Sequence, residues 1–66
     1  MTLTLNGEPV DLPDGATVAD LVATCAPSVR GVAAAVDGAV VPRGTWDRVA
    51  LCEGQRVELL TAVQGG

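Results

Sequence analysis

The sequence predicts an α+β domain in which one helix packs on one face of a mixed β-sheet. Residues 18–25 carry apolar side chains at the spacing of an amphipathic helix, and short alternating or apolar segments on both sides have strand character. Asx-Gly pairs, which favour tight hairpin turns, separate several of these segments. One helix on one face of a sheet is the economical arrangement that buries both kinds of apolar stripe.

The chain begins with a predicted β-hairpin. Its first strand alternates polar and apolar residues, which places Leu3 and Leu5 on one face. The Asn6-Gly7 pair follows, and both residues tolerate the positive φ angles of a tight turn. The returning strand contains Pro9, which has no backbone N–H, so we expect this strand at an edge of the sheet.

A helix is predicted after the hairpin. Thr17 is a good N-cap, and Asp20 three residues later completes a variant of the capping box. Pro27 is expected to end the helix. Its apolar stripe, at positions i, i+3, i+4 and i+7, comprises Val18, Leu21, Val22 and Cys25.

The second half of the chain contains three further predicted strands. Residues 32–36 and 39–41 flank a second hairpin turn at Asp37-Gly38. Residues 44–48 resemble one helical turn, and Trp46 is interpreted as a packing anchor whose indole N–H would need a partner if buried. Residues 56–63, after a turn at Glu53-Gly54, form the longest strand candidate.

This last strand has two apolar faces. Val57, Leu59, Thr61 and Val63 share one face, whereas Leu60 and Ala62 lie on the other. If the helix covers only one side of the sheet, one of these sets faces solvent or a partner, and we interpret Leu60 and Ala62 as a partner surface. We expect residues 1–63 to form the domain and residues 64–66 a flexible tail.

The composition argues against an enzyme with its own active site. The chain has no His, Tyr or Phe, its four basic residues are all Arg, and Ser28 is the only serine. A Ser or Cys nucleophile therefore lacks an imidazole base, and metal sites built on His are excluded. We expect no cofactor and no metal.

The charge and hydropathy exclude other classes. A net charge of −4, with arginines that form no run, disfavours nucleic-acid binding. No signal peptide or membrane-length apolar run is present, so we expect a cytoplasmic protein. In a reducing compartment Cys25 and Cys52 are expected to be small buried apolar residues rather than a disulfide.

The Gln64-Gly65-Gly66 end suggests a reactive carboxylate. Gly66 presents a carboxylate without a neighbouring β-carbon, and Gly65 lets the backbone run extended through a narrow channel of another enzyme. An ionised carboxylate is a poor electrophile, so it must first become a mixed anhydride such as an acyl-adenylate made from ATP. A sulfur nucleophile would then leave a thiocarboxylate, and an amine would leave an amide.

At this point the sequence resembles a known family. Residues 36–46 are similar to the turn, the Val-Pro-Arg and the following Trp of the sulfur carriers of thiazole biosynthesis, the ThiS family. The opening strand into Asn6-Gly7-Glu8, the helix entry at residues 15–18 and the closing Gly65-Gly66 fall where that family has them. The match spans essentially all 66 residues.

The resemblance implies a ubiquitin-like β-grasp fold and a set of partners. An adenylyltransferase related to ubiquitin-activating enzymes would use ATP to adenylate Gly66. Sulfur from a cysteine persulfide, supplied by a donor such as a cysteine desulfurase, would convert Gly66 to a thiocarboxylate. Thiazole synthase would take that sulfur for the thiazole of thiamin, while Gly65 threads the partner channel. Arg43 and Trp46 match the family motif and are assigned structural roles.

Four alternatives remain open at this stage. The small subunit of molybdopterin synthase, or a sulfur carrier of another pathway, would share the tail chemistry. A ubiquitin-like protein modifier would form an isopeptide with a target, although the absence of lysine removes the option of building chains on itself. An interaction domain with an inert tail would do neither.

Overall fold

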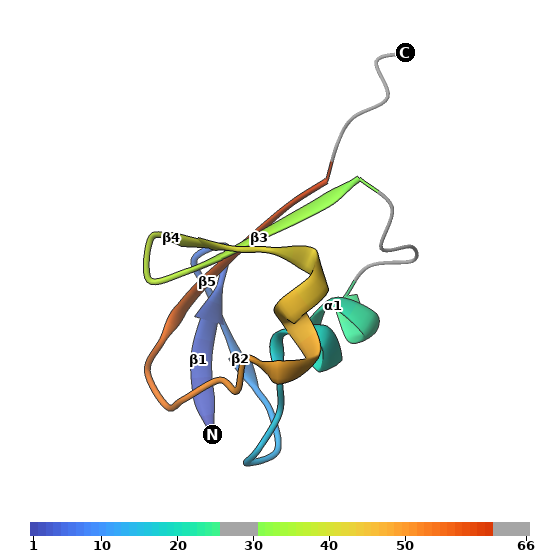
Figure 1. Cartoon of the computed structure of the whole chain (residues 1–66). Coiled ribbons are helices and arrows are strands. Elements are labelled where there is room, and N and C mark those ends of the chain that lie inside the picture. Colours follow the sequence, from blue (N-terminus) through green and yellow to red (C-terminus); the bar gives the residue numbers. More distant parts are fainter. Residues whose placement is uncertain (26–30, 62–66) are drawn as a thin grey trace.

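The computed structural model describes residues 1–25 and 31–61. Within them a five-stranded mixed sheet is accompanied by one α-helix and one 3-10 helix (Figure 1), which confirms the predicted α+β class. The elements in chain order are β1 (Thr2–Leu5), β2 (Glu8–Asp11), α1 (Val18–Cys25), β3 (Val32–Val36), β4 (Ala39–Val41), the 3-10 helix η1 (Arg43–Arg48) and β5 (Arg56–Thr61).

The sheet places the last strand at its centre. The strand order is β2-β1-β5-β3-β4, so β5 lies between β1 and β3. It pairs parallel with β1 and antiparallel with β3, and the two hairpins β1–β2 and β3–β4 form the outer parts of the sheet. β2 is an edge strand, as the missing N–H of Pro9 predicts.

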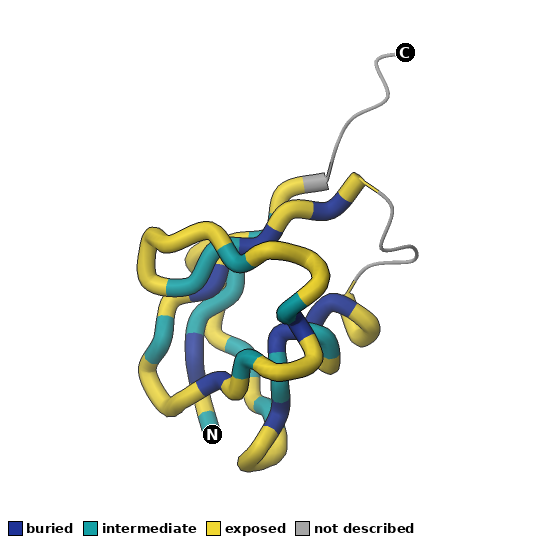
Figure 2. The backbone as a smooth tube through the Cα atoms, in the orientation of Figure 1, coloured by how far each residue is buried: buried dark blue, intermediate teal, exposed yellow. Residues whose placement is uncertain are grey.

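Helix α1 lies over one face of the sheet and buries its apolar stripe there. Leu21 and Val22 of the helix are almost completely buried, as are Leu3 of β1 and Val57 of β5 (Figure 2). The buried cluster comprises Leu3, Val18, Leu21, Val22, Val32, Ala34, Trp46, Leu51 and Val57. One apolar layer between helix and sheet therefore forms the core of the domain.

The helix begins with the predicted capping box. The Thr17 N–H donates to Asp20 Oδ2 at 2.9 Å, and the Asp20 N–H donates to Thr17 Oγ1 at 3.2 Å. These reciprocal bonds satisfy two backbone donors that the first turn leaves without helical partners. The helix ends at Cys25, and Pro27 lies outside the described residues.

Trp46 closes the core from the side of η1. Only 4 % of its surface is exposed, and its indole Nε1–H donates to the Val41 carbonyl oxygen at 2.9 Å. The Arg43 guanidinium lies 6.0 Å from the centre of the Trp46 ring, within the range of a cation–π interaction. The packing role predicted for Trp46 is confirmed, and the structural role of Arg43 stays a prediction.

Both cysteines are exposed, so the prediction that they are buried is wrong. Cys25 is the last residue of α1, and burial along the stripe extends only as far as Val22, because the final turn passes beyond the core. Leu51 occupies the core position next to Cys52, and the adjacent Cys52 side chain consequently faces outward.

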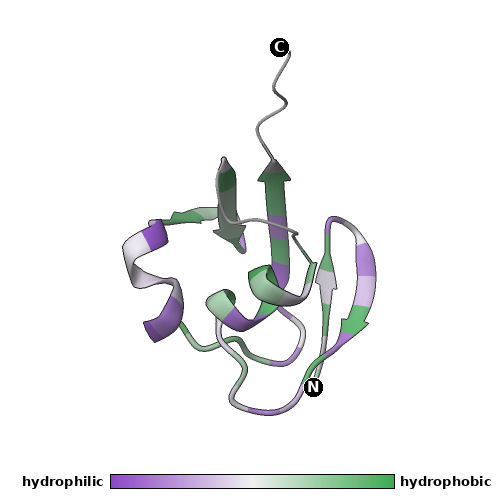
Figure 3. Cartoon of the chain, turned by 90° about the vertical axis from the view of Figure 1, so that its right-hand side faces the viewer, coloured by the Kyte–Doolittle hydropathy of each residue, from purple (hydrophilic) through white to green (hydrophobic). Residues whose placement is uncertain are grey.

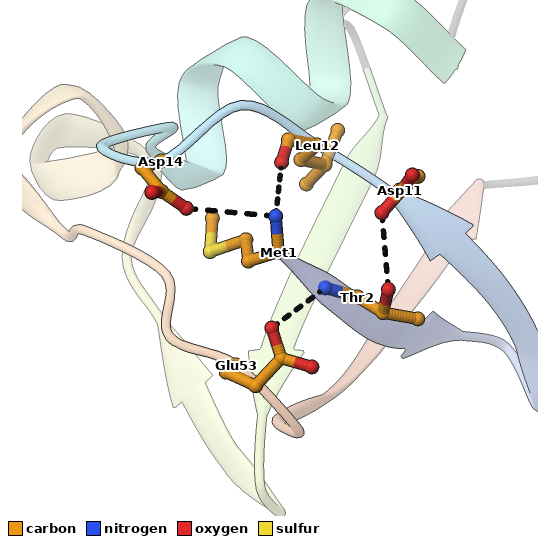
Figure 4. A network of polar contacts seen from close by, with 6 residues as sticks. All are labelled: Met1, Thr2, Asp11, Leu12, Asp14 and Glu53. Atoms are coloured by element: carbon orange, nitrogen blue, oxygen red, sulfur yellow. Dashed lines mark hydrogen bonds and ion pairs between the residues drawn. The ribbon is translucent and has the colours of Figure 1, made fainter.

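Polar contacts tie the beginning of β1 to its neighbours (Figure 4). The Met1 amino group donates to the Leu12 carbonyl oxygen at 2.7 Å and lies 3.5 Å from Asp14 Oδ1. The Thr2 N–H donates to Glu53 Oε1 at 2.9 Å, and the Thr2 hydroxyl donates to Asp11 at 3.0 Å. These contacts lie at one end of the sheet, and β5 finishes at the other end (Figure 1).

Candidate functional site

The predicted reactive residues lie a few positions after β5 in the sequence. Gly65 and Gly66, the tail 64–66 and Ala62 lie outside the described residues. The structure does describe the strand that leads to them, as far as Thr61. The site can therefore be built from what holds β5 and from the surface beside its end.

β5 is held by strands on both sides. Its antiparallel pairing with β3 runs from Val57, opposite Val36, to Thr61, opposite Val32. On the other side, the Thr4 N–H donates to the Gln55 carbonyl oxygen at 3.0 Å, and backbone pairing with β1 reaches Val57. β5 is therefore a central strand held on both sides, and its Val57 side chain is fully buried.

Side chains from both hairpin turns bind the backbone of β5. Asn6 Oδ1 accepts the Leu59 N–H at 2.9 Å, and Asn6 Nδ2 donates to the Leu59 carbonyl oxygen at 3.2 Å. At the start of the strand, Asp37 Oδ1 accepts the Arg56 N–H at 2.9 Å. Both residues have positive φ angles, 51° for Asn6 and 50° for Asp37, which Asn and Asp tolerate better than most residues.

From the sequence alone, Asn6 and Asp37 are predicted only as turn residues. Asn and Asp side chains commonly bind nearby backbone groups, which is a local signal for this role. The partner of Asn6, however, is 53 residues away in the chain. Only the parallel pairing of β1 with β5 brings the two together.

The face of the sheet opposite α1 carries an exposed apolar area next to the end of β5. Leu60 is 70 % exposed, which agrees with its predicted outward position, and Val40 of β4 is 77 % exposed. The strand register connects them, because Leu60 pairs with Ala33, and Ala35 pairs with Val40. We call Leu60, Ala33, Ala35 and Val40 the outer apolar patch. Figure 3 shows the hydrophobic end of β5.

Neither residues 1–25 nor residues 31–61 place three His, Cys, Asp or Glu side chains where they could hold a metal ion. The carboxylates of Asp20 and Asp37 accept hydrogen bonds from backbone N–H groups, those of Thr17 and Arg56. No helix in the described ranges is long and apolar enough to cross a membrane.

A central C-terminal strand, two flanking hairpins and one helix on a single face define a ubiquitin-like β-grasp domain. A family model gives the closer assignment: the ThiS family model matches residues 3–66, and the chain belongs to this family. The resemblance found in the sequence is confirmed. Among curated proteins no match is found.

Solved structures agree with this assignment. The crystal structure of the thiamine biosynthesis protein ThiS from Geobacter metallireducens is 29 % identical to this chain, with a TM-score of 0.84 and complete coverage of both chains. An NMR solution structure of a thiamine biosynthesis protein from the same organism is 30 % identical, with a TM-score of 0.82. That alignment covers 100 % of this chain and 88 % of the other.

Proposed function

We propose that this protein is a sulfur carrier whose Gly66 carboxylate is adenylated, converted to a thiocarboxylate and used as the sulfur source for thiazole formation in thiamin biosynthesis. The observation that carries the proposal is the extent of the ThiS family match, which runs through Gly65 to Gly66 itself. Both structural relatives are thiamine biosynthesis proteins, which supports this pathway. In this role the chain is a protein substrate of other enzymes.

The chemistry would take place in the partner's active site. The Gly66 carboxylate attacks the α-phosphorus of ATP, which forms the acyl-adenylate and releases pyrophosphate. The terminal sulfur of a persulfide then displaces AMP. A second thiol cleaves the resulting acyl persulfide, forming a disulfide and leaving the thiocarboxylate on Gly66. None of these steps requires a base or a metal from the carrier.

The distance from the domain to the reactive group suits this arrangement. Five residues follow Thr61. At roughly 3.3–3.6 Å for each extended residue, they can carry the carboxylate no more than about 18 Å beyond the end of β5. That reach is enough to enter a partner's channel but too short for the domain to stay away from the enzyme surface. Docking of the folded domain is therefore part of the proposal.

We propose the outer apolar patch as the docking surface, with Ala62 extending it along the chain. Leu60 and Val40 are the large apolar side chains most exposed among the described residues, and Leu60 lies one residue before the end of β5. An exposed apolar patch bordered by polar residues, here Glu58 opposite Ala35, is typical of a protein-binding site. The partners would be an adenylyltransferase that uses ATP, thiazole synthase and a sulfur donor such as a cysteine desulfurase.

The test is incubation of the full chain with the adenylyltransferase, ATP and a persulfide donor, followed by intact mass measurement. Replacement of one oxygen by sulfur is the expected result. A covalent adduct with another protein would instead identify a protein modifier, and an unchanged mass would contradict the proposed sulfur carrier function. Adding thiazole synthase with deoxyxylulose phosphate and a glycine-derived imine should return the carrier to its original mass. Failure of that return would contradict the assigned pathway.

A further inference from the structure

We infer that Asn6 is a positioning residue for loading of the C-terminus, because its side chain fastens the last part of β5 from which the tail leaves. This inference rests on the proposed function, since it names the residue that orients the strand for the partner enzyme. Asn6 lies far from the diglycine in sequence and does not touch the reacting atoms. Its effect would be transmitted through Leu59.

The Asn6 side-chain amide extends the hydrogen bonding between β1 and β5 beyond the last backbone bond. Backbone bonds join β1 to β5 up to the Asn6 N–H, which donates to the Val57 carbonyl oxygen at 2.9 Å. The main chain of β1 then turns away at Gly7, where φ is 84°. The side chain continues the pattern, because its carbonyl accepts from and its amide donates to the Leu59 backbone.

The two bonds from Asn6 lie close to the end of β5, the strand that precedes the tail in sequence. Leu59 is two residues before the end of β5, and Gly66 follows seven residues after Leu59. Without the Asn6 amide, the Leu59 N–H and C=O would lose their partner on the β1 side. Only the pairing with β3 would then hold the end of β5. A strand end held from one side frays more readily, which lowers the population of carriers in which β5 is ordered as far as Thr61.

Fraying should raise the KM for the carrier and leave kcat unchanged. When only a fraction of the protein has the binding-competent conformation, the apparent dissociation constant increases by the inverse of that fraction. Asn6 is exposed, so its two hydrogen bonds belong at the low end of the usual range, and together they limit the rise in KM to about fivefold.

The fold provides a matched control at the other end of the same strand. Asp37 occupies the equivalent position in an Asx-Gly turn, has a similar φ angle, and binds the Arg56 N–H and, at 3.4 Å, Gln55 Nε2. Asn6→Gly and Asp37→Gly each remove one side chain with two hydrogen bonds, and glycine accepts the positive φ at both sites. Only the first substitution loosens the end of β5 near the tail.

The experiment measures adenylation kinetics with carrier concentration as the variable, for the wild-type chain and both variants. We expect Asn6→Gly to raise KM by more than about twofold and at most about fivefold, with kcat within about twofold, and Asp37→Gly to leave KM within about twofold. Amide hydrogen exchange should accelerate at Leu59 in the first variant and at Arg56 in the second. The thermal unfolding midpoints of both variants show whether they lose similar stability, so that an effect on KM can be told apart from a general loss of stability.

The outcomes separate this inference from the proposed function. An unchanged KM for Asn6→Gly, or an equal rise for Asp37→Gly, would overturn the positioning role while the wild-type chain is still loaded. If the wild-type chain is never loaded, the proposed function fails, and the positioning role fails with it. Should Asn6→Gly not fold, Asn6→Asp is used instead. This variant keeps the acceptor for the Leu59 N–H but loses the donor to the Leu59 carbonyl oxygen, so a KM above that of the wild type is expected. An unchanged KM for that variant would overturn the inference.

Discussion

Replacing Leu60 by threonine should weaken the interaction with the adenylyltransferase and leave the domain folded. Leu60 is 70 % exposed, so the fold uses only about a third of its apolar surface. Full burial of a leucine side chain contributes about 1.5–3 kcal/mol, so the substitution should cost the free energy of unfolding less than about 1 kcal/mol. Threonine is also a good strand former, which keeps the backbone preference of β5.

The remaining surface of Leu60 is available to a partner. If docking covers it, the lost contact amounts to about 1–2 kcal/mol, or a roughly 5–30-fold higher KM for the carrier in adenylation. Pyrophosphate release at increasing carrier concentrations measures this KM. Leu60→Val is the matched control, because valine has the shape of threonine without its hydroxyl, and its KM should remain near that of the wild type. Equal KM values for Leu60→Thr and Leu60→Val would refute the outer apolar patch as the docking surface.

Three further substitutions test the account of the domain itself. Thr17→Ala removes the hydroxyl that accepts the Asp20 N–H, so the free energy of unfolding in urea should fall by about 1 kcal/mol, and an unchanged value would contradict the capping role. Trp46→Phe leaves the Val41 carbonyl oxygen without its indole donor, which should cost about 1–3 kcal/mol; a midpoint of thermal unfolding equal to that of the wild type would argue against this bond. The double variant Cys25→Ser and Cys52→Ser changes two exposed side chains and should alter stability by no more than about 0.5 kcal/mol. Sulfur loading of that double variant should equal the wild-type level, and its loss would assign the chemistry to a thiol.

The local patterns in the sequence were sufficient to predict the secondary structure. The Asn6-Gly7 and Asp37-Gly38 turns, the edge position of Pro9 and the Thr17 cap are all found as predicted, because each depends on residues close together in the chain. These features fix the element order. Burial of the apolar stripes on one face then leaves few arrangements for one helix and a sheet.

The errors and omissions concern contacts that depend on the whole fold. Cys25 fits the helical stripe, but the core under α1 ends before it. How far the core extends depends on the sheet, which the helical pattern alone does not predict. The bonds from Asn6 to Leu59 and from Asp37 to Arg56 require the strand order, in which two separate turns lie beside β5. Val40 was likewise not recognised as part of the outer apolar patch, because its neighbour Ala35 is set by the strand register.

The central claim is that the sulfur is carried on the C-terminal carboxylate. The most direct measurement is the fragment mass spectrum of the loaded carrier, compared with a variant that lacks Gly66. The account predicts that one sulfur replaces one oxygen on the fragment ending in Gly66, and that the shortened variant gains no sulfur while its thermal unfolding is unchanged. Sulfur found on a fragment containing Cys25 or Cys52, or loading of the shortened variant, would contradict the account.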